Sequence, residues 1–268
     1  MPGLVKEGTI QVGGSDMHYV AFGKGTTPLV IIPGLGDGLR TVKGTGLLMW
    51  LIYRKYAREY RVWIFSRKNE LEPGFTTREM AREQAEAMDK LNIQSAYIMG
   101  VSQGGMISQW LAVDHPQKVS KLVIVVSRSR QNETVQEVVG NWIKMAEQER
   151  YGELAIDTME KAHTEKYLRK WRPFYWLVKR TGKPVSKERF LIQANSCLTH
   201  DAYGELDKIK CPTLVIGGGD DKIIGGPESQ QEMADAIPHS RLILYPELGH
   251  GAYAEAKDFH TQVLDFLR

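Results

Sequence analysis

Cysteine is scarce in this sequence, and long hydrophobic runs are missing. Two of the 268 residues are cysteines, Cys197 and Cys211, which are too few for a disulfide framework and do not form a metal-ligand cluster. The longest apolar run, residues 47–53, is far shorter than the roughly 20 residues that a membrane-spanning helix needs. Residues 1–14 also lack the basic and apolar regions of a signal peptide. We therefore expect a cytoplasmic protein with free thiols.

A strong net charge is missing as well. The chain has 35 Lys and Arg against 32 Asp and Glu, a formal net charge of +3, which argues against nucleic-acid binding. The hydrophobic share of 42% and the charged share of 25% exclude a disordered or fibrous chain and indicate a globular protein. The basic excess is local, because residues 128–190 hold 14 basic and 9 acidic residues.

Short β-rich runs alternate with helical patterns along most of the chain. Several runs are continuously apolar, which is typical of strands buried on both faces of a parallel sheet. The predicted strands cover residues 17–22, 29–32, 62–65, 96–99, 122–126, 213–216 and 242–245. The predicted helices cover residues 77–91, 103–114, 228–236 and 255–267. This order predicts an α/β fold, with a mostly parallel central sheet and helices on both of its faces.

Residues 128–195 interrupt the alternation with a helical pattern that is dense in aromatic side chains. The simplest explanation is one α/β core, built from residues 1–127 and 196–268, with a helical insertion at residues 128–195. The sequence contains no internal repeat and no low-complexity linker that would divide the core further.

A G-x-S-x-G motif carries the clearest chemical signal. Ser102 is flanked by Gly100 and Gly104, directly after the strand at residues 96–99 and before the helix at residues 103–114. Small flanking residues let the strand and the helix approach each other, and the tight turn between them projects the serine hydroxyl above the sheet. The motif therefore predicts a nucleophilic serine.

A second glycine-containing loop, residues 33–36, follows the strand at residues 29–32 and reads Pro-Gly-Leu-Gly. Acyl transfer needs two N–H donors that point at the oxyanion of the tetrahedral intermediate. We expect the backbone N–H groups of Leu35 and Gln103 to supply them.

A candidate acid and a candidate base follow two further predicted strands. Asp220 and Asp221 follow the strand at residues 213–216, and an aspartate there can accept the Nδ1 proton of a histidine. Asp221 is favoured, with Asp220 as the alternative. Among the seven histidines, only His250 has small neighbours on both sides in a loop that follows a strand. It is the expected base, and His200 is the reserve candidate.

With these residues in the order serine, aspartate, histidine, the chain resembles enzymes of the α/β-hydrolase fold over nearly its whole length. The resemblance implies that Ser102 is the nucleophile and His250 the general base. It implies that Asp221 orients the histidine. It also implies that Leu35 and Gln103 are the oxyanion-hole donors.

Two departures limit what the resemblance implies about the substrate. Many capped relatives carry an Asp-x-Arg-Gly-x-Gly-x-Ser stretch after the fourth core strand, where this chain reads Phe-Ser-Arg-Lys-Asn at residues 65–69. Relatives with haloalkane dehalogenase or epoxide hydrolase activity use an aspartate nucleophile, so Ser102 argues against those two reactions.

The segment from about residue 128 to residue 189 resembles the helical cap of that family. We expect an aromatic pocket under it, with Trp142, Trp171 and Tyr175 as substrate-binding residues. Residues 166–189 hold nine basic residues and one acidic residue. One interpretation is a basic rim that attracts anionic substrates or touches a lipid surface. The other is a cap helix whose aromatic side chains pack on the core while lysine and arginine face water.

The expected function is the hydrolysis of carboxylic esters through an acyl-enzyme intermediate. Neither a metal nor an organic cofactor is implied. A lactonase, a thioesterase, an amidase or peptidase, or a C–C bond hydrolase could use the same three residues, and so could a scaffold that senses a small molecule. The expected partner is a small-molecule ester, and the expected assembly is a monomer or homodimer. Contact with nucleic acid or integral membrane contact is not expected.

Overall fold

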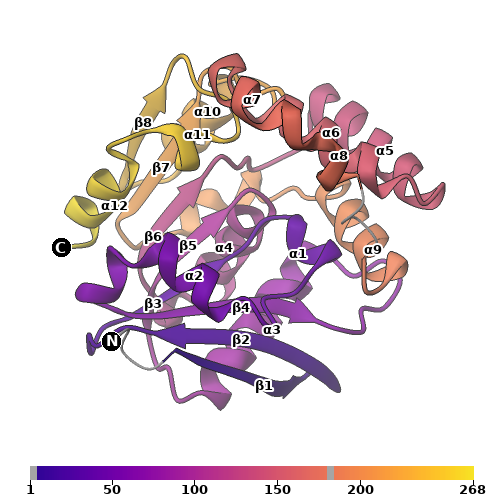
Figure 1. The fold of residues 1–268 in the computed structure, drawn as a ribbon. Coiled ribbons are helices and arrows are strands. Elements are labelled where there is room, and N and C mark those ends of the chain that lie inside the picture. Colours follow the sequence, from indigo (N-terminus) through magenta and orange to yellow (C-terminus); the bar gives the residue numbers. More distant parts are fainter. Residues whose placement is uncertain (1–4, 180–183) are drawn as a thin grey trace.

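An eight-stranded sheet runs through the centre of the molecule (Figure 1). The computed structural model describes residues 5–179 and 184–268. The strand order across the sheet is β1-β2-β4-β3-β5-β6-β7-β8. In chain order the strands are β1 (Lys6–Val12), β2 (Ser15–Phe22), β3 (Pro28–Ile32), β4 (Arg61–Lys68), β5 (Ala96–Val101), β6 (Val119–Val125), β7 (Thr213–Gly218) and β8 (Ser240–Tyr245).

The sheet is parallel from β4 to β8, and β1 and β2 join it in antiparallel pairing at the β4 side. Strand β3 shows why the parallel part reads as a continuous apolar run. Val30 and Ile32 belong to the hydrophobic cluster on one face, and Leu29 and Ile31 belong to the cluster on the other. All four side chains are buried because helices cover both faces.

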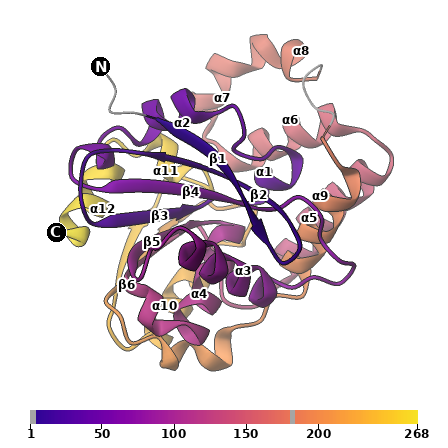
Figure 2. The same ribbon diagram turned by 90° about the horizontal axis from the view of Figure 1, so that it is seen from below.

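Helices pack on both faces of the sheet (Figure 2). One face carries α3 (Thr77–Lys90), α4 (Gln103–Asp114) and α10 (Glu228–Ala236), and the other carries α2 (Gly46–Tyr53) and α12 (Phe259–Leu267). Helix α3 begins with a capping box. The Thr76 side chain accepts a hydrogen bond from the Glu79 N–H, and the Glu79 side chain accepts one from the Thr76 N–H.

Between β6 and β7 the chain leaves the sheet and forms a run of helices. These are α5 (Glu133–Glu147), α6 (Tyr151–Ala162), α7 (Glu165–Trp171), η3 (Arg172–Phe174), α8 (Tyr175–Val178) and α9 (Lys187–Leu198). In Figure 1 they gather at the upper right, beyond one end of the parallel strands. Their buried side chains form a separate hydrophobic cluster, which also includes Met106, Ile223 and Ile224 of the core.

The predicted fold class is confirmed. Every predicted strand overlaps an observed one, and the helices predicted at residues 103–114 and 228–236 have those bounds in the structure. The final helix, predicted over residues 255–267, ends at Leu267 as predicted but begins at Phe259. The chain forms α11 (Ala252–Glu255) and then α12, because the backbone of Ala256 is extended and interrupts the helical hydrogen bonds.

Two larger elements and several short ones were not predicted from the sequence. Strand β1 lies at the sheet edge and buries only Val12, so it has no apolar run to reveal it. Helix α2 is apolar around its whole circumference and therefore shows no helical period. The remaining short elements are α1 (Gly36–Leu39), η1 (Tyr56–Arg58), η2 (Pro116–Lys118) and η4 (Tyr203–Lys208).

Helix α4 approaches the sheet closely at its first turn. A Cβ atom on Gly104 would lie 1.9 Å from the carbonyl oxygen of Ile32 in β3. A Cβ atom on Gly100 would lie 2.3 Å from the carbonyl oxygen of Gly104. Only glycine fits at these two positions, so they set the spacing between the sheet and the helix that follows Ser102.

We expect Gly104→Ala to lower the free energy of unfolding by about 3 kcal/mol or more, because the new methyl group overlaps a backbone oxygen that has no room to move. The matched control is Gly140→Ala in α5, where no atom beyond the adjoining backbone of its own helix lies within 4 Å of the added carbon. That change should raise the free energy of unfolding by about 0.5–1 kcal/mol. Urea denaturation of both variants provides the measurement, and equal stability of the two would contradict the packing argument.

Candidate active site

Ser102 lies at the turn between β5 and α4 in an unusual backbone conformation. Its φ is 55° and its ψ is −120°, a left-handed region that serine rarely adopts. The strain is held by two hydrogen bonds, because the Ser102 N–H donates to the Val125 carbonyl (2.9 Å) and the Ser127 hydroxyl donates to the Ser102 carbonyl (2.8 Å). The turn matches the predicted G-x-S-x-G geometry.

His250 lies between Ser102 and an aspartate. Its Nε2 atom is 2.9 Å from the Ser102 Oγ, and its Nδ1 atom is 2.8 Å from an oxygen of Asp221. The loop that carries His250 follows β8 and is tied to the end of α6, because the Gly251 N–H donates to the Ala162 carbonyl (2.7 Å). The side chains of His250 and Asp221 are thus both buried and hydrogen-bonded to each other.

The two candidate aspartates differ sharply. Asp221 is buried, and its second carboxylate oxygen accepts hydrogen bonds from the N–H groups of Ile223 (2.9 Å) and Ile224 (3.1 Å). The Asp220 side chain is 65% exposed and faces Lys222 instead. The structure therefore brings Asp221, the favoured candidate, to His250 and leaves Asp220 at the surface.

Leu35 and Gln103 lie at two helix N-termini beside the serine. Leu35 precedes α1 and Gln103 is the first residue of α4, where backbone N–H groups have no partner within the helix. In the described part of the chain, neither N–H donates to a backbone carbonyl. The loop before α1 also touches the serine, because a Cβ atom on Gly34 would lie 3.2 Å from the Ser102 Cβ.

Arg67 hydrogen-bonds both to the loop before Leu35 and to the side chain of Gln103. This role was not predicted from the sequence. Its Nη2 atom donates to the carbonyls of Pro33 (2.6 Å) and Gly34 (3.0 Å) and to the Oε1 atom of Gln103 (2.5 Å). The Gly34 carbonyl and the Leu35 N–H belong to one planar peptide unit and point in opposite directions. By holding the carbonyl, Arg67 fixes the direction of the Leu35 N–H.

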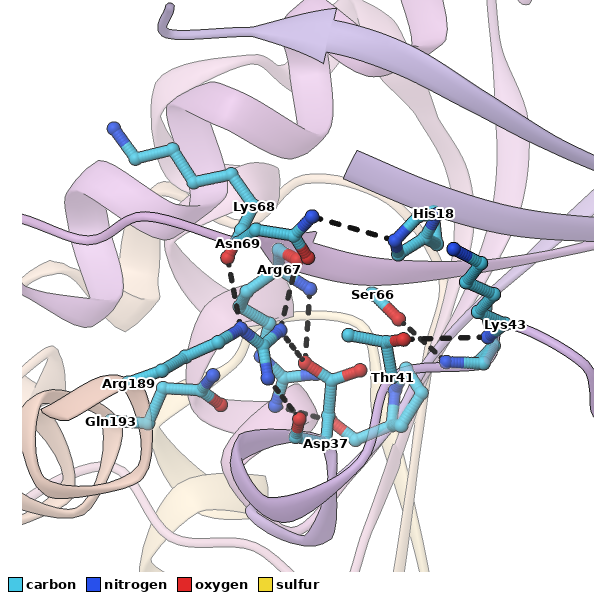
Figure 3. A network of polar contacts seen from close by, with 12 residues as sticks. His18, Asp37, Thr41, Lys43, Ser66, Arg67, Lys68, Asn69, Arg189 and Gln193 are labelled. Atoms are coloured by element: carbon cyan, nitrogen blue, oxygen red, sulfur yellow. Dashed lines mark hydrogen bonds and ion pairs between the residues drawn. The ribbon is translucent and has the colours of Figure 1, made fainter. Parts of the chain in front are cut away.

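A buried carboxylate, Asp37, holds two arginines in this network (Figure 3). One Asp37 oxygen is 2.5 Å from Arg189 Nη2, accepts from the Arg67 N–H at 3.1 Å and lies 3.8 Å from Arg67 Nη1. Burial opposes ionisation of Asp37, but the two guanidinium groups outweigh it and hold its pKa below the ordinary value. Burial lowers the pKa of Arg67 to about 10, which leaves it charged at neutral pH.

Arg189 connects the network to the helical segment. It comes from α9 and also donates to the carbonyls of Lys68 (3.0 Å) and Arg67 (2.9 Å). Gln103 reaches the same helix, since its Nε2 atom donates to the Gln193 carbonyl (2.7 Å). The trace of this network in the sequence is the pair Arg67-Lys68, two charged residues at the end of a strand whose residues 62–65 are apolar.

The aromatic candidates of the helical segment fall into two groups. Trp142 is buried in the cluster that includes Met106 and Ile224, and its indole N–H donates to Asp157 (2.7 Å). Trp171 is 44% exposed and stacks on Tyr167, and the Tyr175 hydroxyl donates to Glu160 (3.0 Å). Trp142 alone among the three belongs to the cluster beside the serine.

His200, the reserve base, lies elsewhere. Its Nδ1 atom is hydrogen-bonded to the Thr77 hydroxyl (2.9 Å), and its ring packs edge-on against Trp110. Burial lowers the pKa of His200 to about 3, so the ring is neutral. Within the described residues, no group of three or more His, Cys, Asp or Glu side chains is arranged to hold a metal ion.

The structure contradicts one of the two interpretations of the basic and aromatic stretch at residues 166–189. Residues 180–183 lie outside the described part of the chain. The interpretation in which the aromatic side chains pack on the core is wrong for Trp171, Phe174 and Trp176, which are 44%, 51% and 56% exposed. These side chains lie on the outer surface of the helical segment.

Comparison with known proteins agrees with the fold. The family model described as the alpha/beta hydrolase fold matches residues 27–257, and the chain belongs to this family. The solved structure of the enol-lactonase from Burkholderia xenovorans LB400 is similar, with a TM-score of 0.83 at 22% identity, covering 97% of this chain and 99% of that one. The family supports a hydrolase as the class of enzyme.

Two curated relatives are similar in sequence. The protein named "Putative non-heme bromoperoxidase BpoC" from Mycobacterium tuberculosis (strain ATCC 25618 / H37Rv) is 29% identical over 260 residues, which cover 89% of this chain and 93% of that protein. The protein named "Putative carbamate hydrolase RutD" from Caulobacter sp. (strain K31) is 27% identical over 207 residues, covering 72% of each chain.

We expect Asp37→Asn to lower the free energy of unfolding by about 3–5 kcal/mol at neutral pH, because two buried guanidinium groups would then face a neutral amide. The depressed pKa means that the Asp37 contribution is complete above the ordinary carboxyl pKa near about 4 and is lost as the pH falls through the lower folded-state value. The difference between the wild type and the variant should therefore shrink below about pH 4 in urea denaturation.

Asp220→Asn is the matched control for this prediction. It removes the same charge from an exposed side chain, so its effect on the free energy of unfolding should stay within about 0.5 kcal/mol. An Asp37→Asn variant as stable as this control at neutral pH would show that the buried network contributes little.

Proposed function

We propose that this chain is a serine hydrolase that cleaves carboxylic esters through an acyl-enzyme intermediate. The observation that carries the proposal is the position of His250, whose ring nitrogens are 2.9 Å from the Ser102 Oγ and 2.8 Å from Asp221. A histidine in this position can remove the hydroxyl proton, and the carboxylate stabilises the imidazolium that forms.

In the proposed reaction the Ser102 oxygen attacks the ester carbonyl carbon as its proton passes to His250. The N–H groups of Leu35 and Gln103 bind the oxyanion of the tetrahedral intermediate. His250 then protonates the leaving alcohol, and the acyl group stays on the serine. A water molecule, deprotonated by His250, attacks the acyl-enzyme and releases the carboxylic acid.

The helical segment at residues 128–195 is proposed to be the cap that encloses the substrate. The support is the hydrophobic cluster in which Trp142 of this segment and Leu35 of the oxyanion loop take part. Trp142 is therefore the preferred substrate-lining residue, and the more outward Trp171 and Tyr175 are secondary candidates. The partner is a small-molecule ester and the assembly a monomer or homodimer, in a cytoplasm that keeps the free cysteines reduced.

The ester class is the first choice among several reactions that the same residues can perform. One relative is named as a carbamate hydrolase and one similar structure as an enol-lactonase. A substrate panel should therefore contain nitrophenyl esters, lactones, thioesters, carbamates and aminoacyl amides. A single-turnover burst without steady-state release would instead favour a scaffold that senses a small molecule.

Ser102→Ala is expected to reduce kcat for a nitrophenyl ester by several orders of magnitude, about 10⁴-fold or more, while the protein stays folded. Alanine removes the nucleophile without adding volume to the turn. The measurement is steady-state hydrolysis, with circular dichroism and the thermal midpoint as the check on folding. Ester turnover at the wild-type rate by the folded variant would refute the proposed nucleophile.

Arg67→Met tests whether the guanidinium positions the oxyanion hole. The variant leaves Asp37 paired with Arg189 alone, so the buried charges balance and the fold should survive. We expect kcat to fall about tenfold to a hundredfold with KM nearly unchanged, since the Leu35 N–H is needed most in the transition state. Arg67→Lys should restore little, because one ammonium group cannot reproduce the planar fork. A stability loss with unchanged kcat would mean a purely structural role.

A further inference from the structure

Helix α2 exposes an unusual amount of apolar surface. It has eight residues, and one side packs on the core through Met49, Trp50 and Tyr53. The other side exposes four large aliphatic side chains, which are Leu47 (64%), Leu48 (53%), Leu51 (47%) and Ile52 (44%). Single exposed leucines are ordinary on protein surfaces, but four on two turns of one helix form a patch that proteins normally cover or use.

A second exposed apolar group lies on the helical segment. It spans α7, η3 and α8 and consists of Trp171 (44%), Phe174 (51%), Trp176 (56%) and Leu177 (44%). Tryptophan and phenylalanine are favoured at the boundary between water and lipid, where a large ring can enter the apolar layer while its surroundings stay wet.

The helices that carry the two groups lie on the same side of the molecule. Helices α2, α7 and α8 all lie toward the viewer in Figure 1, and all three lie along the upper side in Figure 2. Helices α3 and α10 lie on the opposite, lower side in Figure 2. We call the eight exposed side chains of α2 and of the stretch from α7 to α8 the apolar face.

Exposed basic residues neighbour the apolar face along the chain. Residues 38–58 contain no acidic residue and five exposed basic ones, which are Arg40, Lys43, Arg54, Lys55 and Arg58. Residues 165–179 contain one acidic residue, Glu165, and five exposed basic ones, which are Lys166, Arg169, Lys170, Arg172 and Lys179. Arg172 is paired with Glu160 and Glu165, and the other four carry the local positive charge. The two stretches that carry the apolar face thus hold ten exposed basic residues and one acidic residue, in a chain with a net charge of only +3.

We propose that the apolar face docks the enzyme on an anionic lipid surface, with the exposed aliphatic and aromatic side chains in the interface and the surrounding lysines and arginines on the headgroups. Each half of the interaction has a physical basis. Buried apolar area drives insertion, and each basic side chain near an anionic surface adds attraction. The long stems of lysine and arginine let them reach the headgroups while their bases stay with the apolar layer.

A second copy of the chain is a poorer occupant. A two-fold symmetric contact through α2 would bring Lys43, Arg54 and Lys55 of each copy together, and residues 38–58 contain no acidic residue. Glu7 lies at the start of α2 but already accepts hydrogen bonds from the N–H groups of Gly44 and Gly46. Such like-charge contact opposes association. The docking is peripheral, because among the described residues no helix has the length and apolar character needed to cross a bilayer.

Vesicle sedimentation tests the proposal. The full chain is mixed with phosphatidylcholine vesicles in which roughly one lipid in three is phosphatidylglycerol, and with pure phosphatidylcholine vesicles. We expect the protein to bind the anionic vesicles preferentially and to release as the salt concentration rises. We expect the double variants Leu47→Glu with Leu51→Glu, and Phe174→Glu with Leu177→Glu, each to weaken binding at least about tenfold. Lys43→Glu with Lys55→Glu should do the same.

The controls are Tyr203→Glu and Lys210→Glu, which change an exposed aromatic and an exposed basic residue near η4, an element that packs against α10. Both should bind vesicles like the wild type, and all variants should keep the wild-type thermal midpoint. Failure of the wild type to bind anionic vesicles would overturn the proposal. A dimer that the α2 variants dissociate, without vesicle binding, would show that a second copy covers this face instead.

Discussion

The left-handed backbone of Ser102 is the constraint on which the site depends. Serine adopts φ 55° only where its neighbours leave it no alternative, since such a conformation costs about 1–3 kcal/mol. The neighbour across the sheet edge is strained as well, because Val126 has φ 43° and donates its N–H to the Ile216 carbonyl at 2.7 Å. The ends of β5, β6 and β7 thus hold one another, and the serine projects from the turn as a result.

A network of buried charges is the second feature that fixes the geometry at this edge of the sheet. Arg67 comes from β4, Asp37 from α1 and Arg189 from α9, so one network joins the sheet, helix α1 with the loop at residues 33–36, and the helical segment. Buried charge networks are weak contributors to stability when compared with apolar packing, but they specify geometry through their hydrogen-bond directions. Here the direction that is specified is that of the peptide unit between Gly34 and Leu35, the unit whose N–H lies beside the serine.

The parallel sheet and the turn at Ser102 could be predicted from the sequence. The buried charge network and strand β1 could not, for physical reasons. Parallel strands buried on both faces leave continuous apolar runs, and the strand-turn-helix of Ser102 requires glycine at fixed positions, so both features are legible as local patterns. Asp37, Arg67 and Arg189 meet only in three dimensions, from positions up to 152 residues apart. No local period marks such a contact, and a polar edge strand such as β1 leaves no apolar run either.

The apolar face could not be predicted from the sequence for a different reason. A helix that is apolar on all sides has no helical period, so residues 47–53 read only as an apolar run. In the helical segment, aromatic side chains at helical spacing suggest a buried stripe, yet Trp171 and Phe174 face outward. Exposure is decided by which other elements come to cover a face, and that depends on the tertiary structure.

The most direct test of Ser102 as the nucleophile is intact-mass spectrometry after incubation with a fluorophosphonate, which reacts with an activated serine. If Ser102 is the activated nucleophile, we expect a single adduct that maps to Ser102, is absent from Ser102→Ala and forms more slowly on His250→Ala. No adduct on the folded wild type, or an adduct on another serine, would contradict the central claim that Ser102, His250 and Asp221 form a working nucleophilic site.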